Sequence, residues 1–334
     1  MSVLIIAEAG VNHNGNIDLA KEMIIKAKEA GADYIKFQPF IPKQLVSASA
    51  QKAGYQKETT GSDESQLEML AKLALTFEDF KKLQEECKKV GIGFVSTPFD
   101  LESIDFLTTL NMPFWKIPSG EITNEPYLRA IGKTHMPVIM STGMSTVEEI
   151  REALQVLREE GCEDIRLLHC NTQYPTPMED VNLAAMDTLR KEFQVPVGFS
   201  DHTMGIYVPI GAVARGAEVI EKHFTLDHSR EGPDHKASLE PDELKEMIAC
   251  IRQVERAIGS GRKEPSPSEK TNMVAVRKSI VAAKEIKKGE NFTEDNLTTK
   301  RPGDGMSPMK WSLIIGKKAD KDYHVEDKID GFVL

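Results

Sequence analysis

Residues 195–203 read Val-Pro-Val-Gly-Phe-Ser-Asp-His-Thr, and residues 218–225 read Glu-Val-Ile-Glu-Lys-His-Phe-Thr. Each stretch holds a short apolar run typical of a buried β-strand, and a histidine follows the run, His202 in the first and His223 in the second. Two imidazoles at neighbouring strand ends could share one divalent ion, and the serine, aspartate and glutamate beside them favour manganese or magnesium. The alternative is two ordinary strand-end histidines whose ring nitrogens are satisfied by backbone carbonyls. Two histidines alone form no diagnostic spacing, so the rest of the chain must decide.

The same alternation of β-type runs with helical segments continues through most of the chain. Alternating β and α units in this number predict a parallel TIM (β/α)8 barrel, in which chemistry collects at the carboxyl ends of the strands. A doubly wound open sheet competes, but no glycine-rich dinucleotide fingerprint follows the first strand. The predicted strands are residues 4–7, 34–37, 92–96, 114–117, 138–141, 165–169, 197–200 and 219–221, and apolar residues spaced three to four apart mark helices over 17–30, 76–90, 146–160 and 240–258.

Two segments interrupt this rhythm. Residues 46–66 form a long polar insertion after the second predicted strand, and an insertion at a strand's carboxyl end is typical of a functional lid. Residues 259–269 are rich in glycine, proline, serine and charge, which indicates a linker. We therefore predict a catalytic barrel domain over 1–260, a linker over 261–276 and a small domain over 277–334. Such a small domain has a marginal core and would gain stability by docking elsewhere.

Composition excludes several classes of protein. The 334 residues are 40% hydrophobic and 28% charged, as in soluble globular proteins, and no run approaches the roughly 18 apolar residues of a membrane span. A formal charge of -10 argues against a nucleic-acid surface, so an anionic substrate would need a local basic pocket. The first residues lack the basic region of a signal peptide, which predicts a cytoplasmic protein. Four cysteines without framework spacing predict reduced thiols.

Polar residues follow almost every predicted strand. Many could cap the next helix, but lysine does not cap a helix N-terminus, so Lys36 and Lys116 stand out. A lysine at a barrel strand end can form a Schiff base, as in some aldolases, or bind phosphate or carboxylate as a point charge. Two lysines with several hydroxyl donors nearby favour the anion-binding role. Asp234, in the loop after the last strand, could support a metal or a polar substrate, and Arg301 lies on a turn of the small domain.

Eight motifs stand in order along the chain. They are residues 6–15 (IAEAGVNHNG), 36–38 (KFQ), 96–99 (STPF), 116–121 (KIPSGE), 141–144 (STGM), 169–177 (HCNTQYPTP), 199–203 (FSDHT) and 221–224 (EKHF). Together they resemble the bacterial sialic acid synthases. Residues 277–280 (RKSI) and 300–303 (KRPG) are similar to the C-terminal antifreeze-protein-like (SAF) domain of that family. Eight ordered motifs with a matching tail make the resemblance specific.

The resemblance implies a metal-dependent condensation of phosphoenolpyruvate with an N-acylated amino-hexose, which releases phosphate and forms a nine-carbon α-keto acid. It implies manganese, or magnesium or cobalt in its place, on His202 and His223. It also implies a homodimer in which one subunit's small domain covers the other's barrel, so that Arg301 would act in trans. The residues that it implies at the sugar are Gln38, Tyr174, Asp234 and Arg301, with Glu8 and Glu121 near the reacting end. Those that it implies at phosphoenolpyruvate are Lys36, Thr97, Lys116, Ser119, Ser141, Thr172 and Ser200.

Details of the reaction stay open in the sequence. Glu8 and Glu121 are equal candidates for activating water, and some relatives have Thr-Asn where this chain has Asn171-Thr172, so either residue could face phosphoenolpyruvate. Residues 171–177 favour N-acetylmannosamine as the substrate, which predicts an N-acetylneuraminate synthase. Residues 232–238 resemble legionaminate synthases equally, so an N,N'-diacetyllegionaminate synthase that uses 2,4-diacetamido-2,4,6-trideoxymannose is the alternative. A Schiff-base aldolase and a non-enzymatic sugar-binding protein are the alternatives from other classes.

Overall fold

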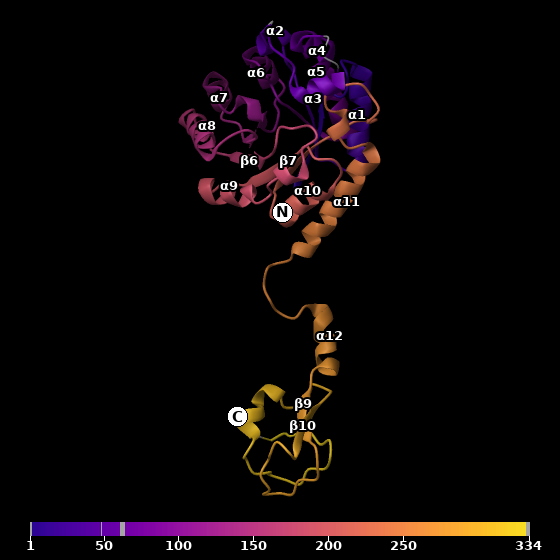
Figure 1. Ribbon diagram of the computed structural model, residues 1–334, viewed down its shortest axis with the longest axis vertical. Helices are drawn as coiled ribbons and strands as arrows, with labels where there is room; N and C mark the ends of the chain where they lie inside the picture. Colours follow the sequence, from indigo (N-terminus) through magenta and orange to yellow (C-terminus); the bar gives the residue numbers. More distant parts are fainter. Residues whose placement is uncertain (1, 48, 61–63, 332–334) are drawn as a thin grey trace. The chain divides into compact units, whose positions relative to one another are not determined.

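The computed structural model describes residues 2–47, 49–60 and 64–331, and within them eight parallel strands form a nearly closed barrel (Figure 1). The strands pair in the order β3-β2-β1-β8-β7-β6-β5-β4, so the first and last strands of the barrel are neighbours. β3 and β4 contact each other at the remaining seam. The predicted TIM barrel is therefore confirmed. The strands are β1 (Leu4–Gly10), β2 (Tyr34–Phe37), β3 (Gly93–Ser96), β4 (Trp115–Ile117), β5 (Val138–Ser141), β6 (Ile165–His169), β7 (Val197–Asp201) and β8 (Val219–His223).

Three strands run further than predicted. β1, β7 and β8 end at Gly10, Asp201 and His223, whereas the prediction ended them at Ala7, Ser200 and Glu221. The parallel ladders continue through these residues, because Glu8 pairs with His223 and Asp201 pairs with Lys222. Asp201 and Lys222 can extend their strands on the buried side because their side chains form an ion pair of 2.6 Å. β3 and β4 each begin one residue later than predicted.

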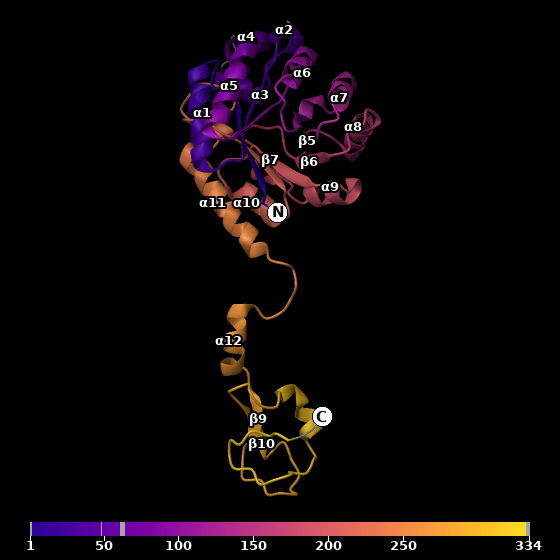
Figure 2. The same cartoon turned by 180° about the vertical axis from the view of Figure 1, so that it is seen from behind.

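Helices surround the strands on the outside of the barrel, as the two opposite views show (Figures 1 and 2). Thr76 and Thr146 begin α5 and α8 with capping boxes, and Gly31 ends α1 in the left-handed region. Within the described residues, no helix combines the length and the apolar character needed to cross a membrane. The helices of this unit are α1 (Ile17–Ala30), α2 (Pro42–Leu45), α3 (Gly54–Thr60), α4 (Gln66–Leu73), α5 (Phe77–Val90), α6 (Leu101–Thr108), α7 (Glu125–Gly132), α8 (Val147–Glu159), α9 (Ala185–Phe193), α10 (Tyr207–Ala214) and α11 (Pro241–Ile258), with 3-10 turns η1 (Ser119–Glu121), η2 (Met178–Asp180) and η3 (His235–Ala237).

Two apolar layers hold the barrel together. The larger lies between strands and helices and contains Ile5, while the smaller fills the barrel interior and contains Ile6. Side chains alternate along a strand, so the residue two positions after an interior residue points to the same side. Glu8 follows Ile6 in this way. The interior residues Val95, Ile139, Leu168 and Val219 are likewise followed two positions later by Thr97, Ser141, Cys170 and Glu221. A mainly polar layer therefore lies at the carboxyl ends of the strands, next to the apolar interior of the barrel.

The insertion after β2 is partly helical. Residues 46–66 were predicted to form a polar lid, and the structure places α3 within them and α4 at their end. Residues 48 and 61–63 of this insertion lie outside the described residues. Ser65 begins α4 with a capping box.

A second compact unit comprises Ser260–Leu334. β9 (Ser279–Ala282) and β10 (Leu297–Lys300) form an antiparallel pair, and a separate core that includes Phe292 and Tyr323 packs beside them. The 3-10 turn η4 (Pro308–Lys310) and the short helix α13 (Trp311–Ile314) complete it.

The predicted linker over 261–276 is only partly irregular, because α12 (Pro267–Val276) occupies most of it. The serine and proline that are typical of linkers have another role here. Ser266 caps the helix, and Pro267 stands at its first turn, where its missing N–H costs nothing. Glu269 completes the capping box.

Candidate active site

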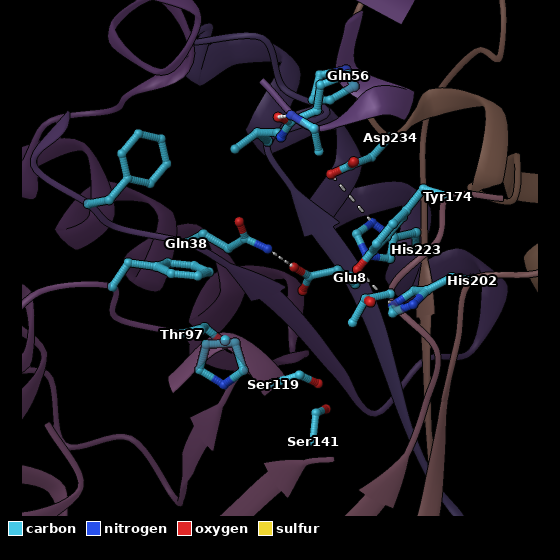
Figure 3. Close-up of a pocket in the computed structure, with 18 of the residues that line it drawn as sticks. Glu8, Gln38, Gln56, Thr97, Ser119, Ser141, Tyr174, His202, His223 and Asp234 are labelled. Carbon is cyan, nitrogen blue, oxygen red and sulfur yellow. Dashed lines mark hydrogen bonds and ion pairs between the residues drawn. The ribbon is translucent and has the colours of Figure 1, made fainter. Parts of the chain in front are cut away.

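The polar layer of the barrel lines a cavity of about 480 Å³ at the carboxyl ends of the strands. All of the predicted site residues line it except Glu121 and Arg301. In Figure 3, Thr97, Ser119 and Ser141 lie toward one end of the cavity and Asp234 toward the other, with Glu8 between them. The cavity therefore has one end rich in hydroxyl groups and another near the loop after β8.

The two remaining predicted residues lie elsewhere. Glu121 ends η1, next to the cavity-lining Gly120, and is half-buried. Asn124 Nδ2 donates to its carboxylate at 2.6 Å, and burial raises the pKa of Glu121. Arg301 belongs to the second unit, where its Nε donates to the carbonyl of Val276 at 3.0 Å.

Lys36 and Lys116 are both buried and share a carboxylate that the sequence analysis missed, Glu221. Lys36 Nζ lies 3.7 Å from Glu221 Oε2, and Lys116 Nζ lies 3.5 Å from Glu221 Oε1. Ser200 donates to Glu221 at 2.9 Å. The signal for Glu221 was present in the sequence, because it stands two residues before His223 on the same strand and so shares its face. Lys36 also pairs with Glu8 at 2.8 Å.

This network alternates positive and negative charges among buried side chains. Burial alone would raise the pKa of Glu221, but Lys116 and Lys36 hold it below its usual value. Burial raises the pKa of Glu8 despite the neighbouring Lys36. Burial likewise lowers the pKa of Lys116, and the arrival of a second anion would raise it again.

Hydroxyl groups surround the lysines. Lys116 Nζ donates to Ser141 Oγ at 2.8 Å, and Lys36 Nζ donates to Thr97 Oγ1 at 3.0 Å. Ser119 Oγ accepts from the backbone N–H of Gly143 at 2.8 Å. The three hydroxyl groups and the two ammonium groups lie at one end of the cavity. All five can donate hydrogen bonds to an anionic ligand.

His202 and His223 lie close together, with ring centroids 5.2 Å apart. His202 Nδ1 donates to the carbonyl of Asn171, so Nε2 carries a lone pair, which accepts from the Tyr174 hydroxyl at 3.1 Å. Burial lowers the pKa of His202 to about 4 and holds that of His223 well below its usual value. Both imidazoles are therefore neutral at pH 7, which is the form that binds metals.

The histidine pair fits a metal with open coordination positions. His223 Nδ1 is buried and has no hydrogen-bond partner in the described part of the chain, and a buried nitrogen without a partner is costly unless a ligand satisfies it. Asp234 Oδ2 lies 3.9 Å away. Among the described residues, no group of three or more histidine, cysteine, aspartate or glutamate side chains is arranged to hold a metal ion. Two imidazoles would thus need water or substrate to complete the shell, as in a catalytic site.

The sugar candidates lie beside the histidines. Gln38 Nε2 donates to Glu8 Oε1, and Tyr174 stacks on His202 with ring centroids 4.1 Å apart (Figure 3). Burial raises the pKa of Asp234 to about 7, and the charge of Glu8 adds to this. Thr172 lines this cavity and also a neighbouring groove, whereas Asn171 lines only that groove.

Family models match both units of the chain. The model described as the NeuB family matches residues 23–263, more than half of the chain. The chain belongs to the NeuB family. The model of the SAF domain matches residues 277–323. The resemblance to sialic acid synthases with a C-terminal antifreeze-like domain is therefore confirmed.

Similarity to NeuB relatives extends over nearly the whole chain. The N,N'-diacetyllegionaminic acid synthase of Campylobacter jejuni is 54% identical over 328 residues, which cover 98% of each chain. The N,N'-diacetyllegionaminic acid synthase of Legionella pneumophila is 47% identical over 322 residues, 95% of this chain and 90% of that one. The solved structure of the sialic acid synthetase of Leptospira borgpetersenii with citrate is 34% identical, covers 81% of this chain and 90% of that one, and has a TM-score of 0.72. Membership of this family makes the chain an enzyme.

Proposed function

We propose that this enzyme is an N,N'-diacetyllegionaminate synthase, which condenses phosphoenolpyruvate with 2,4-diacetamido-2,4,6-trideoxymannose and releases phosphate. The observation that carries the proposal is the 54% identity, over 98% of both chains, with the Campylobacter jejuni synthase of that name. The Legionella pneumophila synthase adds support at 47%, whereas the Leptospira sialic acid synthetase is 34% identical. The comparisons thus support the alternative of the sequence analysis better than its favoured substrate, N-acetylmannosamine.

Phosphoenolpyruvate would occupy the lysine end of the cavity. Its phosphate and carboxylate together carry more negative charge than Glu221 alone, so they would compete with Glu221 for Lys36 and Lys116. The hydroxyls of Ser119, Ser141 and Thr97 would complete the hydrogen bonds of the anion.

A divalent metal, manganese in our proposal, would be held by His202 and His223 and would supply Lewis-acid polarisation of the sugar aldehyde. The carbonyl of Asn171 fixes the ring of His202 from behind through Nδ1, and Nε2, which accepts from the Tyr174 hydroxyl in this structure, is the nitrogen that would bind the metal in place of that hydroxyl. Such partners set the tautomer and direction of a ligand histidine.

The chemistry moves two protons. A carbon–carbon bond forms between C3 of phosphoenolpyruvate and the aldehyde carbon, whose oxygen takes up a proton, and water adds at C2 and loses a proton. The C2 hydroxyl then loses its proton as the bond from C2 to the phosphate oxygen breaks, which leaves the ketone, and the departing phosphate takes that proton. One carboxyl group could give the proton to the sugar oxygen and recover one from the attacking water. We assign this role to Glu8, because it lines the cavity and its raised pKa favours proton uptake. Glu121 stays a prediction for the same step.

Product analysis tests the function. The enzyme, phosphoenolpyruvate and manganese are incubated with either sugar, and the product is identified by mass spectrometry while released phosphate is measured. We expect the diacetamido sugar to give its nine-carbon keto acid with one phosphate per product. A product from N-acetylmannosamine but none from the diacetamido sugar would contradict the proposal.

Metal removal tests the histidine pair. We expect a chelator to abolish phosphate release and manganese to restore it. His202→Ala should lower the metal-dependent rate by at least roughly 100-fold, since even outer-shell partners of a metal are worth 10- to 100-fold. His324→Ala, an exposed histidine of the second unit, is the matched control and should leave the rate unchanged. Full activity in the chelator would refute the metal assignment.

A further inference from the structure

Part of the cavity lining is apolar. Gln66, Met69, Leu70 and Leu73 of α4 all line the cavity, and they follow the three-and-four spacing of one helix face. Leu45, at the end of α2, lines it too. The helix that covers the cavity therefore presents it with a stripe of aliphatic side chains.

These side chains differ in how deeply they are packed. Met69 and Leu73 are buried in a small core with Val11, while Leu45 and Leu70 are only partly buried at its edge. The apolar surface that Leu45 and Leu70 keep exposed borders the cavity.

The position of α4 is fixed by close packing. A Cβ atom on Gly15 would lie 2.4 Å from the carbonyl oxygen of Lys72 in α4, and Gly15 has a φ of +69°. Only glycine allows this approach of the loop after β1 to the helix. The apolar wall is therefore held in a fixed position at the barrel mouth.

Polar side chains line the cavity as well. Gln38, Tyr174 and Asp234 line it, next to the histidine pair. A sugar with hydroxyls on every carbon would leave some of them facing aliphatic side chains without hydrogen-bond partners, which costs binding energy. A sugar with a polar edge and an apolar edge matches both kinds of lining.

We infer that α4 and the end of α2, chiefly through Leu70 and Leu45, select the deoxygenated edge of the sugar: the C6 methyl group and the methyl of the 4-acetamido group. This inference rests on the proposed function and names the residues that decide its substrate. N-acetylmannosamine carries hydroxyls at both positions, so its transition state would gain nothing from this wall. Contact with one or two methyl groups is worth roughly 10- to 100-fold in kcat/KM.

The test is a specificity ratio, measured as kcat/KM for the diacetamido sugar over kcat/KM for N-acetylmannosamine at saturating phosphoenolpyruvate. Leu70→Asn and Leu45→Asn should each lower the ratio by about 10-fold or more, almost wholly through the diacetamido sugar. The KM for phosphoenolpyruvate and the thermal midpoint should stay near those of the wild type. Leu70→Met, which keeps an apolar side chain of similar volume, should retain the ratio.

Leu101→Asn is the control, since Leu101 is exposed on α6 and does not line the cavity. Equal losses for both sugars in the asparagine variants, with the folding midpoint unchanged, would overturn the inference while the proposed function stands. A wild-type enzyme that turns over N-acetylmannosamine and ignores the diacetamido sugar would overturn the proposed function and this inference together.

Discussion

Gly143, in the loop after β5, stands where a side chain has no room. A Cβ there would lie 2.7 Å from Thr172 Cγ2, 2.9 Å from Ser119 Oγ and 3.0 Å from Cys170 Sγ. The glycine thus sets the spacing of two side chains that we propose for phosphoenolpyruvate.

We predict that Gly143→Ala raises the KM for phosphoenolpyruvate by roughly 10- to 100-fold, because displacement of positioning groups by a fraction of an ångström to 1 Å has effects of this size. Steady-state kinetics with each substrate varied in turn will show it. Gly54→Ala is the control, since a Cβ on Gly54 meets no atom within 4 Å. Unchanged kinetics in Gly143→Ala would mean that the anion end tolerates movement of Ser119 and Thr172.

His13 gives a pH-dependent contribution to stability. It is 1% exposed, and burial lowers its pKa to about 4 from an unfolded value of 6.5. Between these values the unfolded chain binds a proton that the folded chain does not, so stability falls as the pH drops from 6.5 to 4. The difference of the two pKa values corresponds to about 3 kcal/mol.

We therefore expect the unfolding free energy of the wild type to decrease more steeply between pH 7 and pH 4 than that of His13→Asn, measured by urea titration at several pH values. Other groups titrate in both proteins, so the comparison isolates His13. Parallel curves for the two proteins would show that His13 is protonated in the folded state as easily as in the unfolded one.

At the scale of elements, a buried lysine forms bonds between separate parts of the insertion. The side chain of Lys52 is 1% exposed, and its Nζ lies 3.0 Å from both Thr60 Oγ1 at the end of α3 and Glu64 Oε1 before α4. Glu64 also pairs with Lys72 of α4. These bonds join the part of the chain before α3 to the helix that forms the apolar wall.

Lys52→Met should loosen this segment by about 1–3 kcal/mol, because it removes two hydrogen bonds of a buried charged group. Hydrogen exchange of the amides of residues 53–60 should accelerate at least roughly 10-fold, while exchange in the strands stays as in the wild type. Lys57→Met, on the exposed side of α3, is the control. Equal exchange in both variants would show that the ion pairs do not hold the segment.

At the scale of the whole molecule, each of the two units has its own apolar core. The proposed sugar ligand Arg301 belongs to the unit that begins at Ser260, and the other proposed ligands belong to the barrel. The family resemblance implies a homodimer in which Arg301 acts on the partner's barrel.

Mixing two inactive variants tests this arrangement. His202→Ala lacks a working barrel and Arg301→Ala lacks the proposed sugar contact, so subunit exchange should restore roughly a quarter of wild-type activity if Arg301 acts in trans in a dimer. Activity is measured after co-refolding or co-expression, and the oligomeric state by light scattering. A mixture without activity, although mixed dimers are present, would show that Arg301 acts on its own barrel, and full activity of Arg301→Ala alone would show that Arg301 does not act at the site.

The sequence by itself determined the barrel, since the alternation of apolar runs with helical periodicity depends on local burial and places strands to within a few residues. It also pointed to Lys36, Lys116 and the two histidines, because polar residues at strand ends meet at one face of a parallel barrel. It did not predict that α12 occupies most of the linker, and it assigned no role to Glu221.

Only the tertiary structure decided the partners within the site. Glu221 lies between two lysines from distant strands, and α4, which directly follows the polar insertion, supplies an apolar wall. Neither follows from local pattern, because ion pairs and cavity walls depend on distances between segments far apart in the chain. The neutral state of His202 and His223 was decided in the same way, because the burial that lowers their pKa values exists only in the folded barrel.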